Sequence, residues 1–360
     1  MVHLRKARGR KGWLLPLLVL LLVGLQAAAC STGGGTADDD GGTADRPADP
    51  EPVTLTVYSG RNEALIGPIL EQFEAETGIS VVVRYGSTGE VAATILEEGA
   101  NSPADVFIAQ DAGALGALAK EGLLRALPGE LLGKVDSRFR SPDGLWVGVS
   151  GRARVVAYNT EKVDPADLPS DIWGFTEPQW RGRLGWAPTN ASFQSFVTAL
   201  RLVEGEDGAR RWLEGIRDNQ PKDYANNVAA LEAVSRGEVD AAFINHYYLY
   251  RLKAEMGDEL KADNYYLTGG DAGALVNVAG VAVLAGTGNA EAAQALVEFL
   301  LSDTAQEYFA RETYEYPLVE GVRPSVDLPP LAEIEAPAID LSDLDDLDRT
   351  IELLTEVGVL

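Results

Sequence analysis

The sequence predicts an α/β fold of two lobes that close as a clamshell. Strand-like and helix-like segments alternate from residue 53, the alternation restarts after residue 150, and a strand-like segment at 275–284 leads the chain back to the first lobe. Such alternation is typical of a parallel sheet that helices cover on both faces. We expect a ligand to bind in the cleft between the lobes and hinge closure to trap it there.

The first lobe is predicted to comprise residues 53–153 and 278–328. Alternating apolar residues predict its strands, and apolar residues at intervals of three and four predict its helices. Ligands bind at the carboxyl ends of strands in such sheets, so 59–62, 87–89 and 110–111 are candidate binding segments. The expected strands are 53–58, 79–85 and 105–109, and the expected helices are 65–77, 90–99, 290–301 and 303–311.

The second lobe is predicted to comprise residues 154–277 and 329–360. The loop 188–192 opens one of its helices, and Thr189 or Asn190 would cap that helix. The free main-chain amides at such a helix N-terminus favour an anion, whereas the alternative is an ordinary cap without a ligand. The expected strands of this lobe are 154–159 and 239–244.

The composition is that of a globular protein with a large negative charge. Its 360 residues are 46% apolar and 24% charged, and 55 acids against 30 bases give a formal net charge of −25. Such a chain repels phosphate backbones, which argues against a nucleic-acid partner. One cysteine and two histidines, His3 and His246, are too few ligands for a typical zinc, copper or nickel site.

Residues 1–29 are predicted to be a lipoprotein signal peptide. Basic residues precede an apolar run that ends in three alanines before Cys30, the order typical of a bacterial lipoprotein cleavage site. We expect cleavage before Cys30 and its lipidation, so that acyl chains tether the protein to the cell membrane, in the periplasm or on the outer face. A retained transmembrane anchor is the alternative. Residues 30–52 then form a flexible acidic linker.

Two adjacent tyrosines, Tyr247 and Tyr248, are candidate metal ligands. They follow a predicted buried strand and begin a helix, and at such a turn both phenols can converge on one point. Phenolate oxygen is a hard anionic donor that suits Fe(III), and a bound ferric ion displaces the phenol proton well below its free pKa of about 10. Ordinary packing is the alternative, because Tyr250, Tyr265 and Tyr266 are also nearby.

Eight short motifs resemble, in the same order, those of the bacterial ferric-ion-binding proteins. These are the transferrin-like solute receptors of iron ABC transporters, and the resemblance extends from Leu55 to about Val319. It therefore covers most of the chain that follows the predicted linker. The motifs are Val57–Arg61, Ser102–Phe107, Val149–Val155, Pro188–Phe193, Tyr224–Asn227, Ile244–Tyr248, Asp271–Val276 and Glu315–Leu318.

The resemblance implies a type II periplasmic-binding-protein fold, two-lobed with crossed hinge strands. It also implies that Tyr247 and Tyr248 supply two iron ligands. A synergistic anion, phosphate or carbonate, would complete the site. The residues that match the family's anion site are Asn190, Ala191 and Ser192, assisted by Asn227.

Two positions depart from the family pattern. Asn62 and Gln110 stand where well-known members have a histidine and a glutamate, and neutral amides are poor ligands of Fe(III). Three accounts remain: an exogenous anion and water fill the open positions, the ligand is an iron chelate such as ferric citrate, or the site takes another anionic solute. Arg61 follows the first strand and would pair either with such an anion or with a nearby acid.

The function that follows is a lipid-anchored, extracytoplasmic receptor that captures ferric iron and delivers it to an ABC permease, as a monomer and without catalysis. One alternative is a receptor for a phosphonate or phosphate ester. Another is a secreted hydrolase, but the chain lacks a Gly-x-Ser-x-Gly motif and offers only His246 as a base. We expect a structural or supporting role for His246, and structural roles near the hinge for Arg152 and Arg154.

Overall fold

The computed structural model describes residues 53–360, so the predicted signal peptide 1–29 and the whole predicted linker 30–52, Cys30 included, lie outside the described residues. The described strands form a ten-stranded sheet in the order β2-β1-β3-β10-β5-β8-β6-β7, with β4 paired to β10 and β9 to β5. Their bounds are β1 (Thr54–Ser59), β2 (Ser80–Tyr85), β3 (Val106–Ala109), β4 (Leu124–Arg125), β5 (Val147–Asn159), β6 (Leu184–Trp186), β7 (Lys222–Asp223), β8 (Ala241–Asn245), β9 (Ala262–Tyr265) and β10 (Val276–Leu284).

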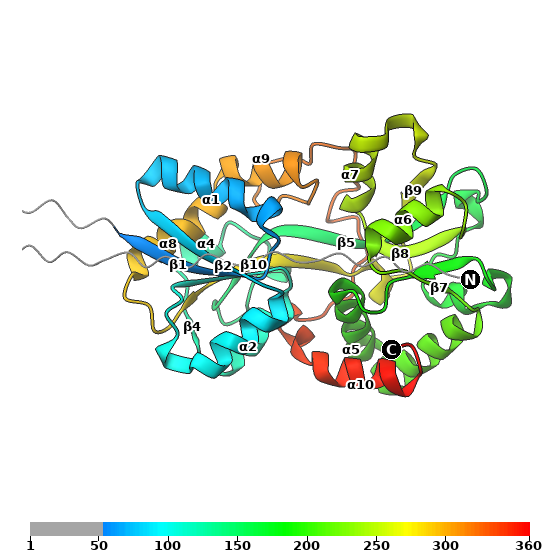
Figure 1. Ribbon diagram of the computed structural model, residues 1–360, viewed down its shortest axis with the longest axis horizontal. Helices are drawn as coiled ribbons and strands as arrows, with labels where there is room; N and C mark the ends of the chain where they lie inside the picture. The colour runs from blue at the N-terminus through cyan, green and yellow to red at the C-terminus, as the bar shows by residue number, and fades with distance from the viewer. Residues whose placement is uncertain (1–52) are drawn as a thin grey trace, which may run out of the picture. The chain divides into compact units, whose positions relative to one another are not determined.

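Helices surround each end of this sheet, and β5 and β10 run between the two groups (Figure 1). The helices α1, α2, α8 and α9 lie with β1 to β4, whereas α5, α6 and α7 lie with β6 to β9. The bounds are α1 (Glu63–Thr77), α2 (Thr88–Glu98), α3 (Ala112–Lys120), α4 (Gly129–Leu132), α5 (Ala191–Asp218), α6 (Asn227–Ser235), α7 (Tyr247–Met256), α8 (Ala290–Leu300), α9 (Asp303–Glu312) and α10 (Leu347–Glu356).

Two long antiparallel strands, β5 and β10, connect the lobes. β10 pairs with β3 of the first lobe and also with the first half of β5, from Val276 opposite Ala153 to Val281 opposite Val147. The second half of β5 continues past β10 and pairs with β8 and β9. Every residue of both strands is buried, as expected for strands that are covered on both faces. The predicted α/β class and the predicted return strand at 275–284 agree with this arrangement.

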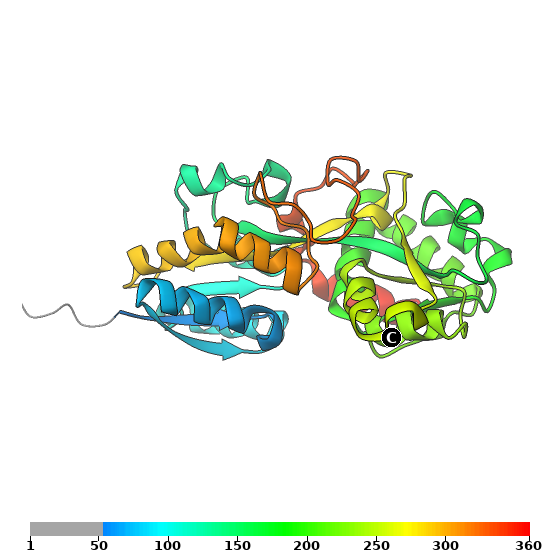
Figure 2. The same ribbon diagram turned by 90° about the horizontal axis from the view of Figure 1, so that it is seen from above.

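Local sequence signals explain how the first helix forms. The side chain of Asn62 caps α1 by accepting a hydrogen bond from the main-chain nitrogen of Ala64, and Gly78 ends it in the left-handed conformation at φ 72°. Between these ends the apolar residues lie on one face and are buried, and α9 lies beside this helix (Figure 2). Capping at Asn62 therefore fixes the end of α1 that directly follows the β1 strand.

The C-terminal segment contacts both lobes. A short 3₁₀ helix, η8 (Leu341–Asp345), packs against α3, and α10 packs against α5. At Gly116 of α3 a β-carbon would lie 2.0 Å from the main-chain oxygen of Ser342, so only glycine allows this approach. The assignment of residues 329–360 to the second lobe stays a prediction, as do the other lobe boundaries. No helix within 53–360 has the length and apolar character to cross a membrane.

Candidate functional site

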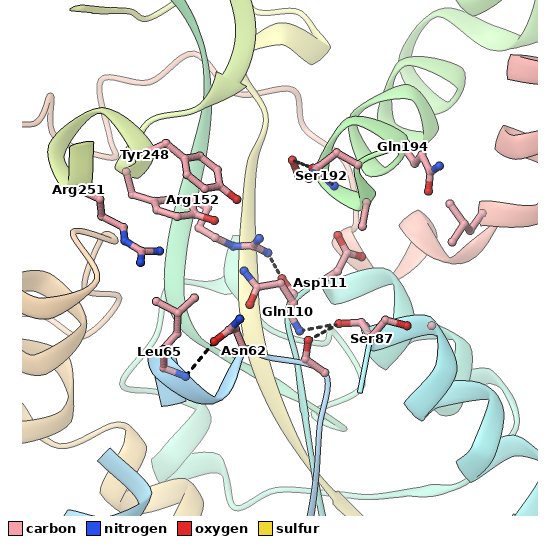
Figure 3. A pocket seen from close by; sticks show the side chains of 18 residues that line it. Asn62, Leu65, Ser87, Gln110, Asp111, Arg152, Ser192, Gln194, Tyr248 and Arg251 are labelled. Atoms are coloured by element: carbon pink, nitrogen blue, oxygen red, sulfur yellow. Dashed lines mark hydrogen bonds between the residues drawn. The ribbon is translucent and has the colours of Figure 1, made fainter. Parts of the chain in front are cut away.

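A cavity of about 640 Å³ lies where the two lobes face each other across β5 and β10. The first lobe contributes the residues that follow β1 and β3 and the start of α2, and the second lobe contributes the starts of α5 and α7 (Figure 3). These are the strand ends at which a ligand was predicted to bind. The polar residues of its wall are Asn62, Ser87, Thr88, Gln110, Asp111, Arg152, Asn190, Ser192, Gln194, Tyr247, Tyr248 and Arg251.

The tyrosine pair begins α7, which follows β8 after His246. Tyr247 and Tyr248 both line the cavity, and their rings stack with centroids 4.2 Å apart and an interplanar angle of 30°. Tyr247 is only 3% exposed. Burial and the neighbouring Tyr248 raise the pKa of Tyr247 well above 10, although the charge of Arg152 opposes this. Tyr247 is therefore a neutral phenol in the protein alone, and a strongly polarising cation is needed to displace its proton.

The predicted anion loop is held in place by its own hydrogen bonds. Asn190 caps α5, and its Oδ1 accepts from the main-chain nitrogen of Ser192 at 3.0 Å and from Ser192 Oγ at 2.7 Å. Asn227 is fully buried behind the loop, and its Nδ2 donates to Asn190 Oδ1 at 3.2 Å and to Ser192 Oγ at 3.0 Å. Ala191 lines the cavity between them. The structure thus brings all four predicted anion-loop residues together beside the tyrosines.

The two amides of the first lobe differ in what their oxygens do. Asn62 lines the cavity, but its Oδ1 is used to cap α1, through a 2.9 Å bond from the nitrogen of Ala64. Gln110 is held by its main chain, whose nitrogen donates to Thr88 Oγ1 and whose oxygen accepts from the guanidinium of Arg152. Its side-chain Oε1 is buried without a hydrogen-bond partner in the described chain. Of the two oxygens, that of Gln110 is therefore the one that no group of the described chain engages.

One carboxylate, Asp111, lines the cavity among the described residues, and it is already engaged. Its Oδ1 caps α3 by accepting from the nitrogen of Gly113 at 2.8 Å. Its Oδ2 accepts from Asn277 Nδ2 at 2.6 Å and from the hydroxyl of Ser195 on α5. Asp111 thus joins the first lobe to β10 and to the second lobe, and its charge serves this connection.

Arg61 does not line the cavity, which corrects its predicted role in anion binding. Its side chain is fully buried, with Nη2 2.8 Å from Glu315 Oε2 and Nη1 3.0 Å from Ser150 Oγ. Burial alone would raise the pKa of Glu315, but the charges of Arg61 and Arg152 outweigh it and hold that pKa below its usual value. The alternative interpretation, a salt bridge to an acid of the same chain, is the one observed.

His246 is not available as a base. Its Nδ1 accepts a hydrogen bond from the main-chain nitrogen of Ala153 at 3.1 Å, so Nε2 carries the proton and donates to the main-chain oxygen of Tyr314 at 3.0 Å. Burial lowers its pKa to about 4, and the ring is neutral near pH 7. Both nitrogens are occupied within the protein, which argues for a structural role and against a hydrolase that uses His246.

The predicted structural arginines of the hinge lie close to the site. Arg152 donates to the main-chain oxygens of Gln110 and Val278 and has its Nε 4.0 Å from Glu315 Oε1. Arg154 is buried behind the anion loop, where it donates to the main-chain oxygen of Ser192 at 3.4 Å. Burial lowers the pKa of Arg154 to about 9. Both side chains therefore fix the ends of segments that line the cavity.

Sequence reasoning missed Arg251. It lies on α7, one helical turn after the tyrosines, is half-buried and lines the cavity. It forms no ion pair or hydrogen bond with any described residue. Its spacing of four residues from Tyr247 places both on one helix face, and that was the available signal. The described chain contains no group of three or more histidine, cysteine, aspartate or glutamate residues that could hold a metal.

Comparisons with known proteins agree with the predicted resemblance. The pattern of the bacterial extracellular solute-binding protein family matches residues 101–345. The major ferric iron-binding protein of Neisseria meningitidis serogroup B is 35% identical over 317 residues, which are 87% of this chain and 95% of that protein. These findings confirm the resemblance to ferric-ion-binding solute receptors.

Two solved structures show the same fold. Iron-bound HitA from Pseudomonas aeruginosa is 39% identical, with a TM-score of 0.79 over 85% of this chain and 100% of that one. The Trichodesmium protein IdiA (FutA), in complex with iron and citrate, is 31% identical, with a TM-score of 0.75 over 85% of this chain and 99% of that one. The predicted two-lobed fold class is thereby confirmed.

Proposed function

The chain belongs to the family of bacterial extracellular solute-binding proteins, and from that premise we propose that it captures ferric iron for uptake. The observation that carries the proposal is the pair Tyr247 and Tyr248, two adjacent phenols that both line the cavity between the lobes. Relatives named for ferric iron binding and iron uptake support it. The iron is the cargo of the protein, and no chemical conversion is needed for its capture.

The charge of the ferric ion requires more than the two tyrosines. Two phenolates neutralise two of its three positive charges, and Asp111 is engaged in hydrogen bonds elsewhere. We infer that a bound anion, phosphate or carbonate, or a chelator that arrives with the iron, supplies the rest. The loop Asn190–Ser192 is the proposed anion site, with Asn227 holding it from behind. Gln110 would add at most a weak neutral oxygen ligand, since the oxygen of Asn62 caps α1.

Titration with ferric ion in phosphate buffer tests the proposal. The wild type should develop a visible phenolate-to-iron absorption band as iron binds. In the double variant Tyr247→Phe, Tyr248→Phe the band should vanish, and iron affinity should fall by more than the roughly 100-fold that loss of a supporting residue costs. Tyr250→Phe is the matched control, since Tyr250 lies on the same helix but bonds to the main-chain oxygen of Asp327.

Equal iron binding by the wild type and the double variant would contradict the iron proposal. If the wild type then bound a phosphonate or phosphate ester at the anion loop, the protein would be a receptor for another anionic solute. The loop Asn190–Ser192 suits that ligand equally, because main-chain amides at a helix N-terminus favour any small anion. The absorption band therefore separates the two functions.

For the chain's location we infer a lipid anchor at Cys30, with cleavage after residue 29 and delivery of iron to an ABC permease by a monomer. The order of basic and apolar residues before Cys30 and the family support this inference, and residues 1–30 lie outside the described part of the structure. Cys30→Ala should release the protein from the membrane fraction or leave it unprocessed. Membrane association with wild-type gel mobility in that variant would indicate a retained helix instead.

A further inference from the structure

Arg251 is a cation in the cavity wall for which the described chain provides no counter-charge. Arg61 pairs with Glu315, and Arg152 donates to two main-chain oxygens and faces the same carboxylate. Arg154 also lacks an ion pair among the described residues, but it is buried outside the cavity wall and donates to the main-chain oxygen of Ser192. Arg251 has neither an ion pair nor a hydrogen bond among residues 53–360. Arginine is permanently charged, so a half-buried and unpaired guanidinium in a ligand cavity favours an anionic ligand.

The position of Arg251 separates it from the anion loop. Figure 3 shows Ser192 and Arg251 on opposite sides of Tyr248, with Ser192 at the start of α5 and Arg251 on α7. A single phosphate or carbonate held at Asn190–Ser192 would lie on the Ser192 side of Tyr248, opposite to Arg251. An anion with several charged groups, bound to the iron at the tyrosines, offers one group to the anion loop and another to Arg251.

The two amides of the first lobe fit the same ligand. Because the oxygen of Asn62 caps α1, the group that this side chain has left for a ligand is its Nδ2, a donor. Gln110 also presents an amide to the cavity, and its Nε2 is a donor. Amide N–H groups are of no use to a ferric ion, but they bind carboxylate oxygens well. The positions that are poor iron ligands are therefore suitable donors to an organic acid.

We propose that the physiological cargo is ferric iron bound to a small polycarboxylate, and that Arg251 binds a carboxylate of this chelator. The proposal rests on the proposed function and specifies its ligand. Tyr247 and Tyr248 bind the iron, while the planar guanidinium of Arg251 matches a carboxylate with two parallel hydrogen bonds. The cavity of about 640 Å³ is within the range of pockets that hold small organic ligands.

The test follows iron and chelator separately. Ferric citrate made with radiolabelled citrate is offered in one arm, and ferric ion with excess inorganic phosphate and no organic acid in the other. After desalting, the wild type should retain about one citrate for each iron. Arg251→Gln should bind ferric citrate at least about tenfold more weakly and lose less in the phosphate arm. Arg251→Lys, which keeps the charge but not the paired geometry, should lie between.

Lys253→Gln is the matched control, because Lys253 is an exposed cation on the same helix that does not line the cavity. It should retain iron and citrate as the wild type does. Iron retained without label by the wild type, or equal label on the wild type and Arg251→Gln, would overturn the chelate inference and leave iron capture intact. Iron retained in neither arm would overturn the proposed function, and this inference with it.

Discussion

The two sides of the cavity hold similar numbers of polar side chains, but they use them differently. On the first lobe Asn62 caps α1, and Asp111 caps α3 and accepts from two further donors. On the second lobe Tyr247 and Tyr248 stack on each other and face the cavity, and Arg251 has no partner in the described chain. The difference indicates that the polar groups of the first lobe mainly hold its own structure, whereas the second lobe leaves more of its groups available to a ligand.

The largest effect is expected where a buried charge of the supporting structure is removed. Glu315→Gln should leave the fully buried Arg61 without its counter-charge and lower the free energy of unfolding by about 3–5 kcal/mol. Iron binding by the folded variant should stay within a few-fold of the wild type, as neither residue lines the cavity. Urea unfolding and an iron titration below the unfolding range measure the two quantities separately.

A surface pair provides the control for that comparison. Glu307→Gln removes an exposed partner of Arg311 and should lower the free energy of unfolding by at most about 0.5 kcal/mol.

The direction in which stability depends on pH follows from Glu315, because its pKa is lower in the folded protein than its ordinary 4.5. Its stabilisation is complete above that value and is lost as the pH falls below it. A large loss of iron affinity in Glu315→Gln would contradict the division of roles.

The sequence was sufficient for the features that depend on local signals. The periods of apolar residues predicted β1 to β3 and α1. The tyrosine pair was also predictable, because two adjacent phenols directly follow a predicted buried strand and begin a helix. Arg61 was ambiguous because its partner Glu315 lies 254 residues away. The contact of η8 with α3 also joins segments that are far apart in the chain. It depends on Gly116, and a glycine in the sequence does not indicate which segment packs against it.

Arg251 escaped prediction for a different reason. A single cation on a helix is ordinary, and only the tertiary structure shows that this one lacks an acidic partner and faces the cavity. Its i, i+4 relation to Tyr247 was visible in the sequence, but this spacing does not show whether the cation finds an acidic partner in the folded chain. Function at this site therefore depends on which charges remain unpaired after folding.

A smaller effect is expected from adding one anionic metal ligand to the first lobe. Gln110→Glu places an anionic oxygen where the buried Oε1 has no partner, and should tighten ferric ion in phosphate buffer by about tenfold, or about 1.4 kcal/mol. Competition with a chelator of known affinity measures the change. Gln194→Glu, also in the cavity wall but on α5, is the control. Unchanged affinity in Gln110→Glu would mean that position 110 does not reach the metal.

The smallest effect is expected at the anion loop, where Ser192 is already hydrogen-bonded within the protein. Ser192→Ala removes a hydroxyl that donates to Asn190 and accepts from Asn227. Loss of one such bond costs about 0.5–1.5 kcal/mol, so the iron dissociation constant should rise by about 2- to 12-fold at saturating phosphate. The rise should shrink when phosphate is withdrawn, because the loop then has no anion to hold. A phosphate series on both proteins measures this dependence.

Ser87→Ala sharpens the test, because Ser87 also lines the cavity but belongs to the first lobe. Its side chain caps α2 by accepting from the main-chain nitrogen of Glu90, so its loss should lower the free energy of unfolding by about 1 kcal/mol. The phosphate dependence of iron binding should not change in this variant. If Ser87→Ala altered that dependence as much as Ser192→Ala, the anion would lie between the lobes, and the first lobe would take part in anion binding.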